Sequence, residues 1–219
     1  MVRDRFERGS QAPLSGPARP ATALRHQDLR AELLAAAEHQ IETRGLAHLR
    51  ARELANQAGC SLGAIYNVFT DLDELILAVN ANTLRAIDRE MTGIEDGDPL
   101  QQLTALANAY LTYAERHWLR WEALFSHRMP PEAVVPQWFQ DVQNAAFSRI
   151  EGPLALLRPD LPQAARSLLG RSIFAAIHGM VALGLDRRGL PMDLPVLRSQ
   201  IALMVGAIAR GLPSGEVPA

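Results

Sequence analysis

The chain has 219 residues, of which 48% are hydrophobic and 21% charged, and its formal net charge is −2. This length allows one large domain or two small ones with a buried core. A single cysteine excludes an internal disulfide and a multi-cysteine zinc site. The sequence has no run of about eighteen apolar residues, and its first ten residues include five charged ones and no apolar core. We therefore expect no membrane span, no signal peptide and a cytoplasmic location.

Residues 1–22 mix Arg, Pro, Gly and Ser with few apolar residues, and this composition predicts a disordered arm. From there on, apolar residues recur at helical spacing, and no alternating run lies between paired turn signals. The sequence therefore predicts an all-α fold of about nine helices.

The first part of the chain is expected to form four helices, at residues 22–44, 50–58, 62–68 and 71–91. Glycines end the first two of them, Gly45 and Gly59. Ser61 can cap the third helix, and Thr70 or Asp71 can cap the fourth. We expect these helices to form one domain, residues 23–91.

A turn-rich segment at 92–99 marks the predicted domain boundary. Asp98 can cap the next helix, with Pro99 in its first position. Further helices are expected through 118–127, 137–157, 162–188 and 194–211, with a kink at Gly152-Pro153. Together they predict a second helical domain, residues 98–211, followed by a frayed tail at 212–219.

Residues 50–69 form the most informative segment, because two short helices separated by Gly59-Cys60-Ser61 predict a helix-turn-helix. The positions expected to face inward are apolar: Leu54, Ala55, Ala58, Ile65, Tyr66 and Phe69. The other positions of the second helix are taken as small or polar: Leu62, Gly63, Ala64 and Asn67. A helix that enters the major groove of DNA needs such a surface, since bulk would hold it away from the base edges.

This segment resembles the TetR family pattern. The matching residues are Leu54-Ala55, Ala58-Gly59, Ser61, Gly63, Ile65-Tyr66, Phe69 and Leu75, within a region of about residues 24–80. The resemblance implies a homodimer that binds a palindromic operator in double-stranded DNA and responds to a small-molecule effector. The DNA-binding residues that we expect are Arg50, Arg52, Ser61, Leu62, Gly63, Ala64, Tyr66, Asn67 and Thr70.

The chain also departs from that pattern at four positions. Family members often carry Lys or Pro at Leu62, Thr at Ala64, an aromatic residue at Val68 and Lys at Leu72. Several of those residues contact phosphate, so their absence predicts weaker anchoring on the DNA backbone. The candidate replacements are Arg50 and Arg52, the backbone amides at the start of the fourth helix, Tyr66 and the arm. The arginines of the arm either reach the minor groove and the phosphates or carry incidental charge: Arg3, Arg5, Arg8 and Arg19.

Aromatic residues concentrate in the second domain, where they either line a ligand pocket or simply fill the core. The candidate ligand-binding residues are His117, Trp118, Trp121, Phe125, Trp138, Phe139, Phe174 and His178. For His178, a buried or interface histidine with a hydrogen-bond partner is the alternative. Small residues on the last two helices favour close packing with a second subunit, and the resemblance implies a four-helix dimer interface that includes Ala176, Gly179, Met204, Val205 and Ile208.

No motif for catalysis or for a cofactor is evident in the sequence. The six histidines are scattered, and none pairs with another at metal-binding helical spacing. We therefore expect no enzyme, no metal and no cofactor. The predicted function is a repressor released from its operator by a small apolar or amphipathic ligand. The alternatives are an activator or a regulator controlled by a protein partner, and a helical ligand-binding protein that has lost DNA binding.

Overall fold

The structure is a computed structural model that describes residues 19–94, 97–186 and 191–211. These residues form nine α-helices, one 3₁₀ turn and no β-strand, which confirms the all-α prediction for the described part of the chain. The helices are α1 (Arg19–Arg44), α2 (Ala51–Gln57), α3 (Leu62–Val68), α4 (Leu72–Glu90), α5 (Pro99–Arg116), α6 (Trp118–Ser126), α7 (Gln137–Leu157), α8 (Gln163–Leu185) and α9 (Leu194–Gly211).

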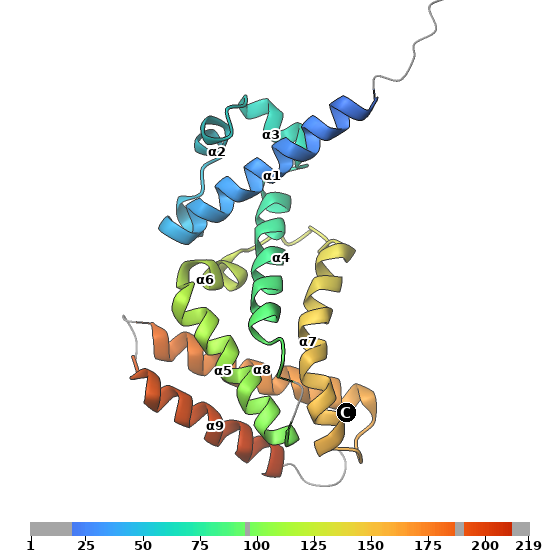
Figure 1. The fold of residues 1–219 in the computed structure, drawn as a ribbon, viewed down its shortest axis with the longest axis vertical. Helices are drawn as coiled ribbons and strands as arrows, with labels where there is room; N and C mark the ends of the chain where they lie inside the picture. The colour runs from blue at the N-terminus through green and yellow to red at the C-terminus, as the bar shows by residue number, and fades with distance from the viewer. Residues whose placement is uncertain (1–18, 95–96, 187–190, 212–219) are drawn as a thin grey trace, which may run out of the picture.

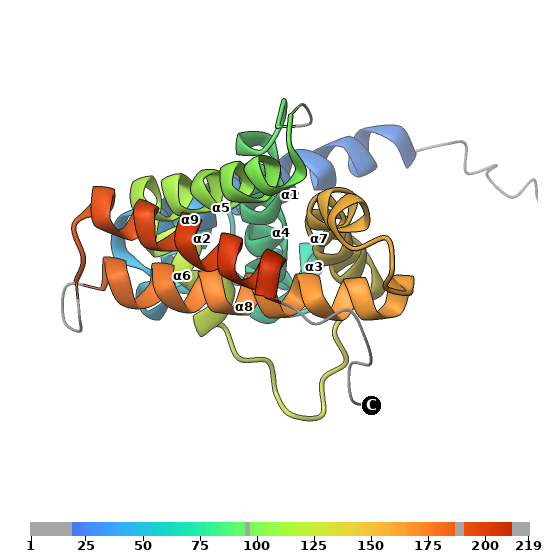
Figure 2. The same cartoon turned by 90° about the horizontal axis from the view of Figure 1, so that it is seen from below.

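Helices α1, α2 and α3 form one end of the elongated molecule, and α5 to α9 form the rest (Figure 1). Helix α4 runs from the first group into the second. Helices α8 and α9 lie side by side at the end far from α3 (Figures 1 and 2). The predicted helix-turn-helix and the predicted helical domain are therefore separate in space and joined by α4.

Capping side chains define where several helices begin. The Ser61 hydroxyl accepts a hydrogen bond from the Ala64 amide at 3.2 Å, and the Asp71 carboxylate accepts one from the Glu74 amide at 2.7 Å. The Glu74 carboxylate reaches back to the Thr70 amide, also at 2.7 Å. Asp98 caps α5 in the same way. These contacts satisfy amide groups that have no partner inside their own helix.

The largest differences from the predicted helix limits are at the start of α1 and the end of α8. Helix α1 begins at Arg19, so residues 19–22 of the predicted arm are helical. A 3₁₀ turn at Leu46–His48 precedes α2, and α8 ends at Leu185. Pro153 lies inside α7, which continues past it to Leu157. The rest of the predicted arm, residues 1–18, and the predicted tail, residues 212–219, lie outside the described residues.

Two large hydrophobic cores stabilise the two ends, and α4 contributes to both. Leu75 and Val79, near its start, are fully buried against α1, α2 and α3. Ile87, near its end, packs in the core of α5, α8 and α9. Ala123 of α6 also belongs to the first core. Burial of each large apolar side chain contributes about 1.5–3 kcal/mol, so neither end is independent of α4.

Helix α8 is long and apolar enough, by length and composition alone, to cross a membrane. Core helices of globular proteins meet the same criterion. Here Ile173, Ile177 and Val181 of α8 are buried in the second core, so this helix is weak evidence for a membrane protein.

Candidate functional site

Helix α3 presents an exposed surface that begins at its capping residue. Ile65 and Phe69 are buried and hold the helix against the core. The exposed residues, called here the α3 surface, are Ser61, Leu62, Gly63, Tyr66, Asn67 and Thr70, with Ala64 half-buried beside them. The expectation that Tyr66 packs inward is wrong, because one residue corresponds to 100° of helix rotation and Ile65 takes the inward position; Tyr66 is 50% exposed.

Side chains of α1 pack against α3 and its C-terminal end through contacts that no sequence pattern indicates. The His26 ring nitrogen Nε2 lies 2.8 Å from the carbonyl oxygen of Asn67, near the end of α3. The Arg30 guanidinium lies over the Phe69 ring, 4.2 Å from its centre, and 3.6 Å from the Glu74 carboxylate. No local pattern could reveal these contacts, since about forty residues separate the partners in the chain.

The positions where the chain departs from the family pattern fall into two groups. Val68 and Leu72 are partly buried against the first core. Leu62, by contrast, is 38% exposed. Arg50 donates from Nη1 to the carbonyl oxygens of Ala47 and Leu49, at 2.9 Å each, while Arg52 is exposed. The α3 surface is thus uncharged, and these two arginines on the neighbouring α2 segment supply positive charge.

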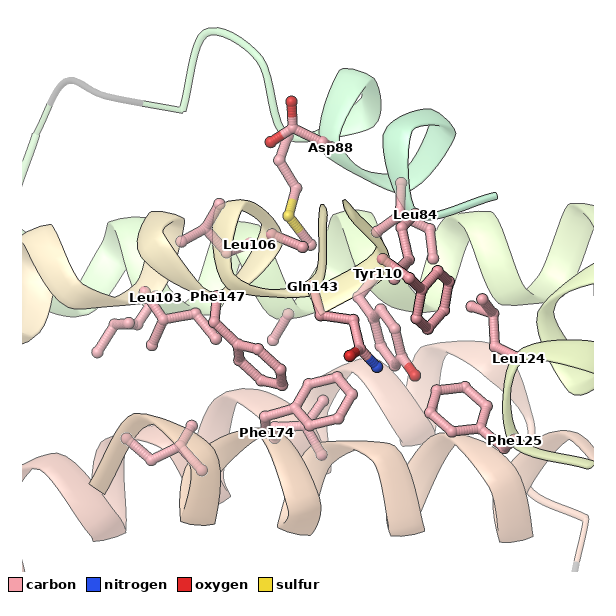
Figure 3. A pocket seen from close by; sticks show the side chains of 18 residues that line it. Leu84, Asp88, Leu103, Leu106, Tyr110, Leu124, Phe125, Gln143, Phe147 and Phe174 are labelled. Carbon is pink, nitrogen blue, oxygen red and sulfur yellow. The ribbon is translucent and has the colours of Figure 1, made fainter. Parts of the chain in front are cut away.

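A second site is an apolar cavity of about 230 Å³ that is lined by side chains of α4, α5, α6, α7 and α8 (Figure 3). Its aromatic lining residues are Tyr110, Phe125, Phe139, Phe147 and Phe174. Aliphatic residues such as Leu84, Ile87 and Leu103 complete the walls, and Asp88 and Gln143 are the remaining polar lining residues among those described.

Three of the eight candidate ligand-binding residues line this cavity, namely Phe125, Phe139 and Phe174. Trp121 and His178 lie behind the lining residues, with ring centres 5.3 and 4.0 Å from that of Phe125.

The other three candidates do not line this cavity. The Trp118 ring lies tilted against Trp121 with ring centres 5.2 Å apart, Nδ1 of His117 lies 2.8 Å from the Glu42 carboxylate, and Trp138 is 39% exposed. Aromatic character alone does not say which face of a helix a residue occupies.

The ionisable groups at the cavity are paired. The Tyr110 hydroxyl lies 2.9 Å from Nδ1 of His178. Burial raises the pKa of Tyr110, which the nearby Trp121 indole opposes only in part, and burial lowers the pKa of His178. Both groups are therefore neutral near pH 7. The two carboxylate oxygens of Asp88 accept hydrogen bonds from Arg149, at 2.7 and 3.2 Å.

A polar junction connects α6 with α1. Nη2 of Arg120 lies 3.5 Å from the Glu38 carboxylate, and its Nε lies 3.8 Å from that of Glu42, which also contacts His117. Leu124, one turn further along α6, lines the cavity. Helix α6 thus contacts both the cavity and the helix that supports α3.

The outer face of α8 and α9 is apolar and exposed. Its large side chains are Leu168, Leu183, Val196, Leu203 and Met204. A Cβ built on Gly179 would have no atom within 4 Å inside the chain. Among the expected interface residues, Val205 is fully buried in its own core and Ile208 packs against that core, so neither projects outward, because they share the inward face of α9 with Ile201.

A helix-turn-helix with an exposed second helix, joined by α4 to a helical bundle with an apolar cavity, is the architecture of a transcriptional regulator that carries its own ligand-binding domain. Two family descriptions match the sequence: "Bacterial regulatory proteins, tetR family" over residues 33–79, and "Tetracyclin repressor-like, C-terminal domain" over residues 103–208. The chain belongs to the TetR family of transcriptional regulators, which are DNA-binding proteins and not enzymes.

Solved structures share this fold at low sequence identity. A tetR-family regulator from Streptomyces coelicolor has a TM-score of 0.60 and 18% identity over 83% of this chain and 79% of its own. RolR in complex with resorcinol has a TM-score of 0.62 and 16% identity, over 87% of this chain and 90% of its own. BioQ with its double-stranded DNA operator has a TM-score of 0.61 and 19% identity, over 82% of this chain and 97% of its own. Among proteins with curated annotation, none matches this sequence.

Proposed function

We propose that this protein is a cytoplasmic homodimeric repressor that leaves its operator when a small apolar or amphipathic ligand fills the apolar cavity. Two copies of α3 enter successive major grooves of a palindromic site, and the ligand changes the distance between them. A ligand can drive this change only if its affinity differs between the two arrangements.

The observation that carries the proposal is the course of α4. Leu75 and Val79 of this helix pack against the core that holds α3, whereas Leu84 and Ile87 line the cavity. A ligand that displaces the end of α4 therefore moves the support of the helix-turn-helix. Interior side chains are close-packed, so such a displacement is transmitted along a helix rather than absorbed.

The exposed, uncharged α3 surface supports the DNA-binding half of the proposal. We assign base or backbone contacts to the DNA-binding residues expected from the sequence: Arg50, Arg52, Ser61, Leu62, Gly63, Ala64, Tyr66, Asn67 and Thr70. BioQ, which has the same fold, is known with its operator, and RolR is known with resorcinol. Both roles proposed for this chain are thus found among proteins of this fold.

The exposed face of α8 and α9 supports the dimer. An apolar patch of this kind on a soluble protein marks an interaction surface. A two-fold axis through this face would leave both copies of α3 free at the far end of the molecule, as binding to a two-fold operator requires (Figure 1). We place Ala176, Gly179 and Met204 in this interface.

The proposal is tested by selecting duplexes from a random DNA library with the purified protein at physiological salt. Enrichment of a palindromic site supports it, and the site then serves as the probe for release by ligands. A reporter fused to the selected site distinguishes repression from activation. If no sequence is enriched, specific repression is refuted, and the uncharged positions Leu62 and Ala64 would then explain a ligand-binding protein without DNA binding.

A further inference from the structure

The size of the apolar cavity restricts what it can hold. An engineered apolar cavity of about 150 Å³ accommodates benzene, and pockets for drug-sized ligands occupy about 300–1,000 Å³. The cavity here, at about 230 Å³, lies between these two limits. It therefore suits a compound with one ring and a short substituent.

The walls of the cavity favour an aromatic ring. Phe174 packs edge-on against Phe147 and Tyr110, with ring centres 5.1 and 5.5 Å apart and interplanar angles of 86° and 70°. These rings hold one another in place, so they present fixed faces and edges to the cavity. A planar ring gains from edge-to-face contacts with such walls beyond the burial of its area.

The charges around the cavity favour a neutral ligand. Among the described residues, no arginine or histidine lines it, so an anion would find no counter-ion there. Asp88 is its one acidic lining residue; both oxygens accept hydrogen bonds from Arg149, and Figure 3 shows them turned away from the rings. A cation would have to displace that arginine, and an unpaired charge in an apolar site is strongly unfavourable.

Gln143 supplies the polar group that a neutral ligand could recognise. Gln143 is an exposed residue of α7 that lines the cavity, and Figure 3 shows its side chain directed toward the rings of Tyr110 and Phe174. In the part of the chain that the structure describes, no group forms a hydrogen bond with this amide, whereas the Tyr110 hydroxyl is already bonded to His178. The Gln143 amide therefore offers both a donor and an acceptor to a bound molecule.

We infer that the effector is a neutral compound with a single aromatic ring and one hydrogen-bonding substituent, which the Gln143 amide recognises. The inference deepens the proposed function, and it rests on that function for the claim that the bound compound controls DNA binding. Binding to the cavity can nevertheless be measured without DNA, so the two claims can fail separately.

The test is titration calorimetry of the full chain with five probes: p-cresol, toluene, benzoate, benzylammonium and 4-methylcyclohexanol. We expect p-cresol to bind most tightly. Benzoate and benzylammonium should bind at least about tenfold more weakly because their charge has no partner. 4-Methylcyclohexanol keeps the hydroxyl but lacks the flat ring, and it should also bind more weakly than p-cresol.

Two variants locate the binding site. Gln143→Leu should weaken the binding of p-cresol by about fivefold, which is typical of one lost hydrogen bond. The same variant should bind toluene as tightly as the wild type or more tightly. Ala146→Phe places a ring in the cavity and should abolish binding of every probe. The matched controls Asn144→Leu and Ala145→Phe change exposed neighbours on α7 that do not line the cavity, and they should bind like the wild type.

The outcomes distinguish the two claims. Tighter binding of benzoate, benzylammonium or 4-methylcyclohexanol than of p-cresol overturns the inference, as does an equal loss for p-cresol and toluene in Gln143→Leu. Absence of binding by all probes also overturns it, even when an operator has been selected. Binding of p-cresol by a protein that selects no DNA site supports the ligand class and refutes the repressor.

Discussion

The α3 surface is formed by residues that lie within ten positions of one another in the sequence, whereas the apolar cavity draws its lining from five helices between Leu84 and Ile177. At the first site a short helix, a cap and two buried residues define which side chains face outward. At the second, only the packing of distant helices does so. Local sequence therefore determines the α3 surface, and tertiary packing determines the shape and lining of the cavity.

The largest effect should come from a substitution on the α3 surface. Gly63→Glu adds a carboxylate where a Cβ meets only Ser61 Oγ, at 4.0 Å, so the fold has room for it. Repulsion from phosphate and the loss of close approach should lower operator affinity by about a hundredfold or more in fluorescence anisotropy. Affinity for p-cresol should not change. The control is Gly152→Glu on α7, also in open space; a similar loss of DNA binding there would break the comparison.

The next effect concerns the face that we assign to the dimer. Gly179→Leu fits the isolated chain, because no atom lies within 4 Å of the new Cβ. A clash with a second copy should raise the dimer dissociation constant by about tenfold or more, measured by analytical ultracentrifugation. Gly152→Leu serves as the matched control. An unchanged dimer in Gly179→Leu would place the interface elsewhere.

A smaller effect should show whether the junction between α6 and α1 couples the cavity to the α3 surface. Arg120 joins α6 to both Glu38 and Glu42 of α1. Arg120→Gln should leave the separate affinities for operator and p-cresol nearly unchanged but reduce the effect of p-cresol on operator affinity by about fivefold. The control, Arg116→Gln, changes a more exposed arginine of α5 that pairs with Glu90 at 3.9 Å. If ligand-induced release persists fully in Arg120→Gln, this junction does not couple the sites.

The smallest effect should appear in the pH dependence of stability. Burial lowers the pKa of His178, so the folded chain holds this ring neutral while the unfolded chain protonates it below about pH 6.5. Its contribution to stability is therefore present above that pH and is lost as the pH falls. His178→Gln should reduce the loss of stability between pH 7.5 and 5.5 in urea unfolding, whereas His39→Gln, an exposed control, should not. His127, whose pKa burial also lowers, keeps part of the dependence in both variants.

Most helix limits could be predicted from the sequence because they depend on near neighbours. Ser61, Asp71 and Asp98 act as caps where expected, and α3, α7 and α9 begin and end at the predicted residues. Gly45 and Gly59 adopt the positive φ angles, 80° and 61°, that such helix ends require. Local chemistry was sufficient for these features.

The cavity could be predicted only in part. Aromatic character points to Phe125, Phe139 and Phe174, which line it, but it points equally to Trp138, which is exposed and does not. Gln143 gave no signal, because a glutamine on a helix with many polar residues is ordinary in a sequence. The role that we propose for it comes from the cavity that five helices form beside it, and no window of the sequence contains those helices together.

The continuity of α4 has a consequence for protein engineering. A chimeric regulator joins the helix-turn-helix domain of one protein to the ligand-binding domain of another, and the turn-rich segment after Met91 looks like the natural junction. A fragment cut there would carry Leu84 and Ile87 away from the bundle that buries them and leave them in water. A crossover inside α4, between Val79 and Leu84, would instead keep Leu75 and Val79 with the first core and Leu84 and Ile87 with the helical bundle. A biosensor built from this chain should therefore be spliced within a helix.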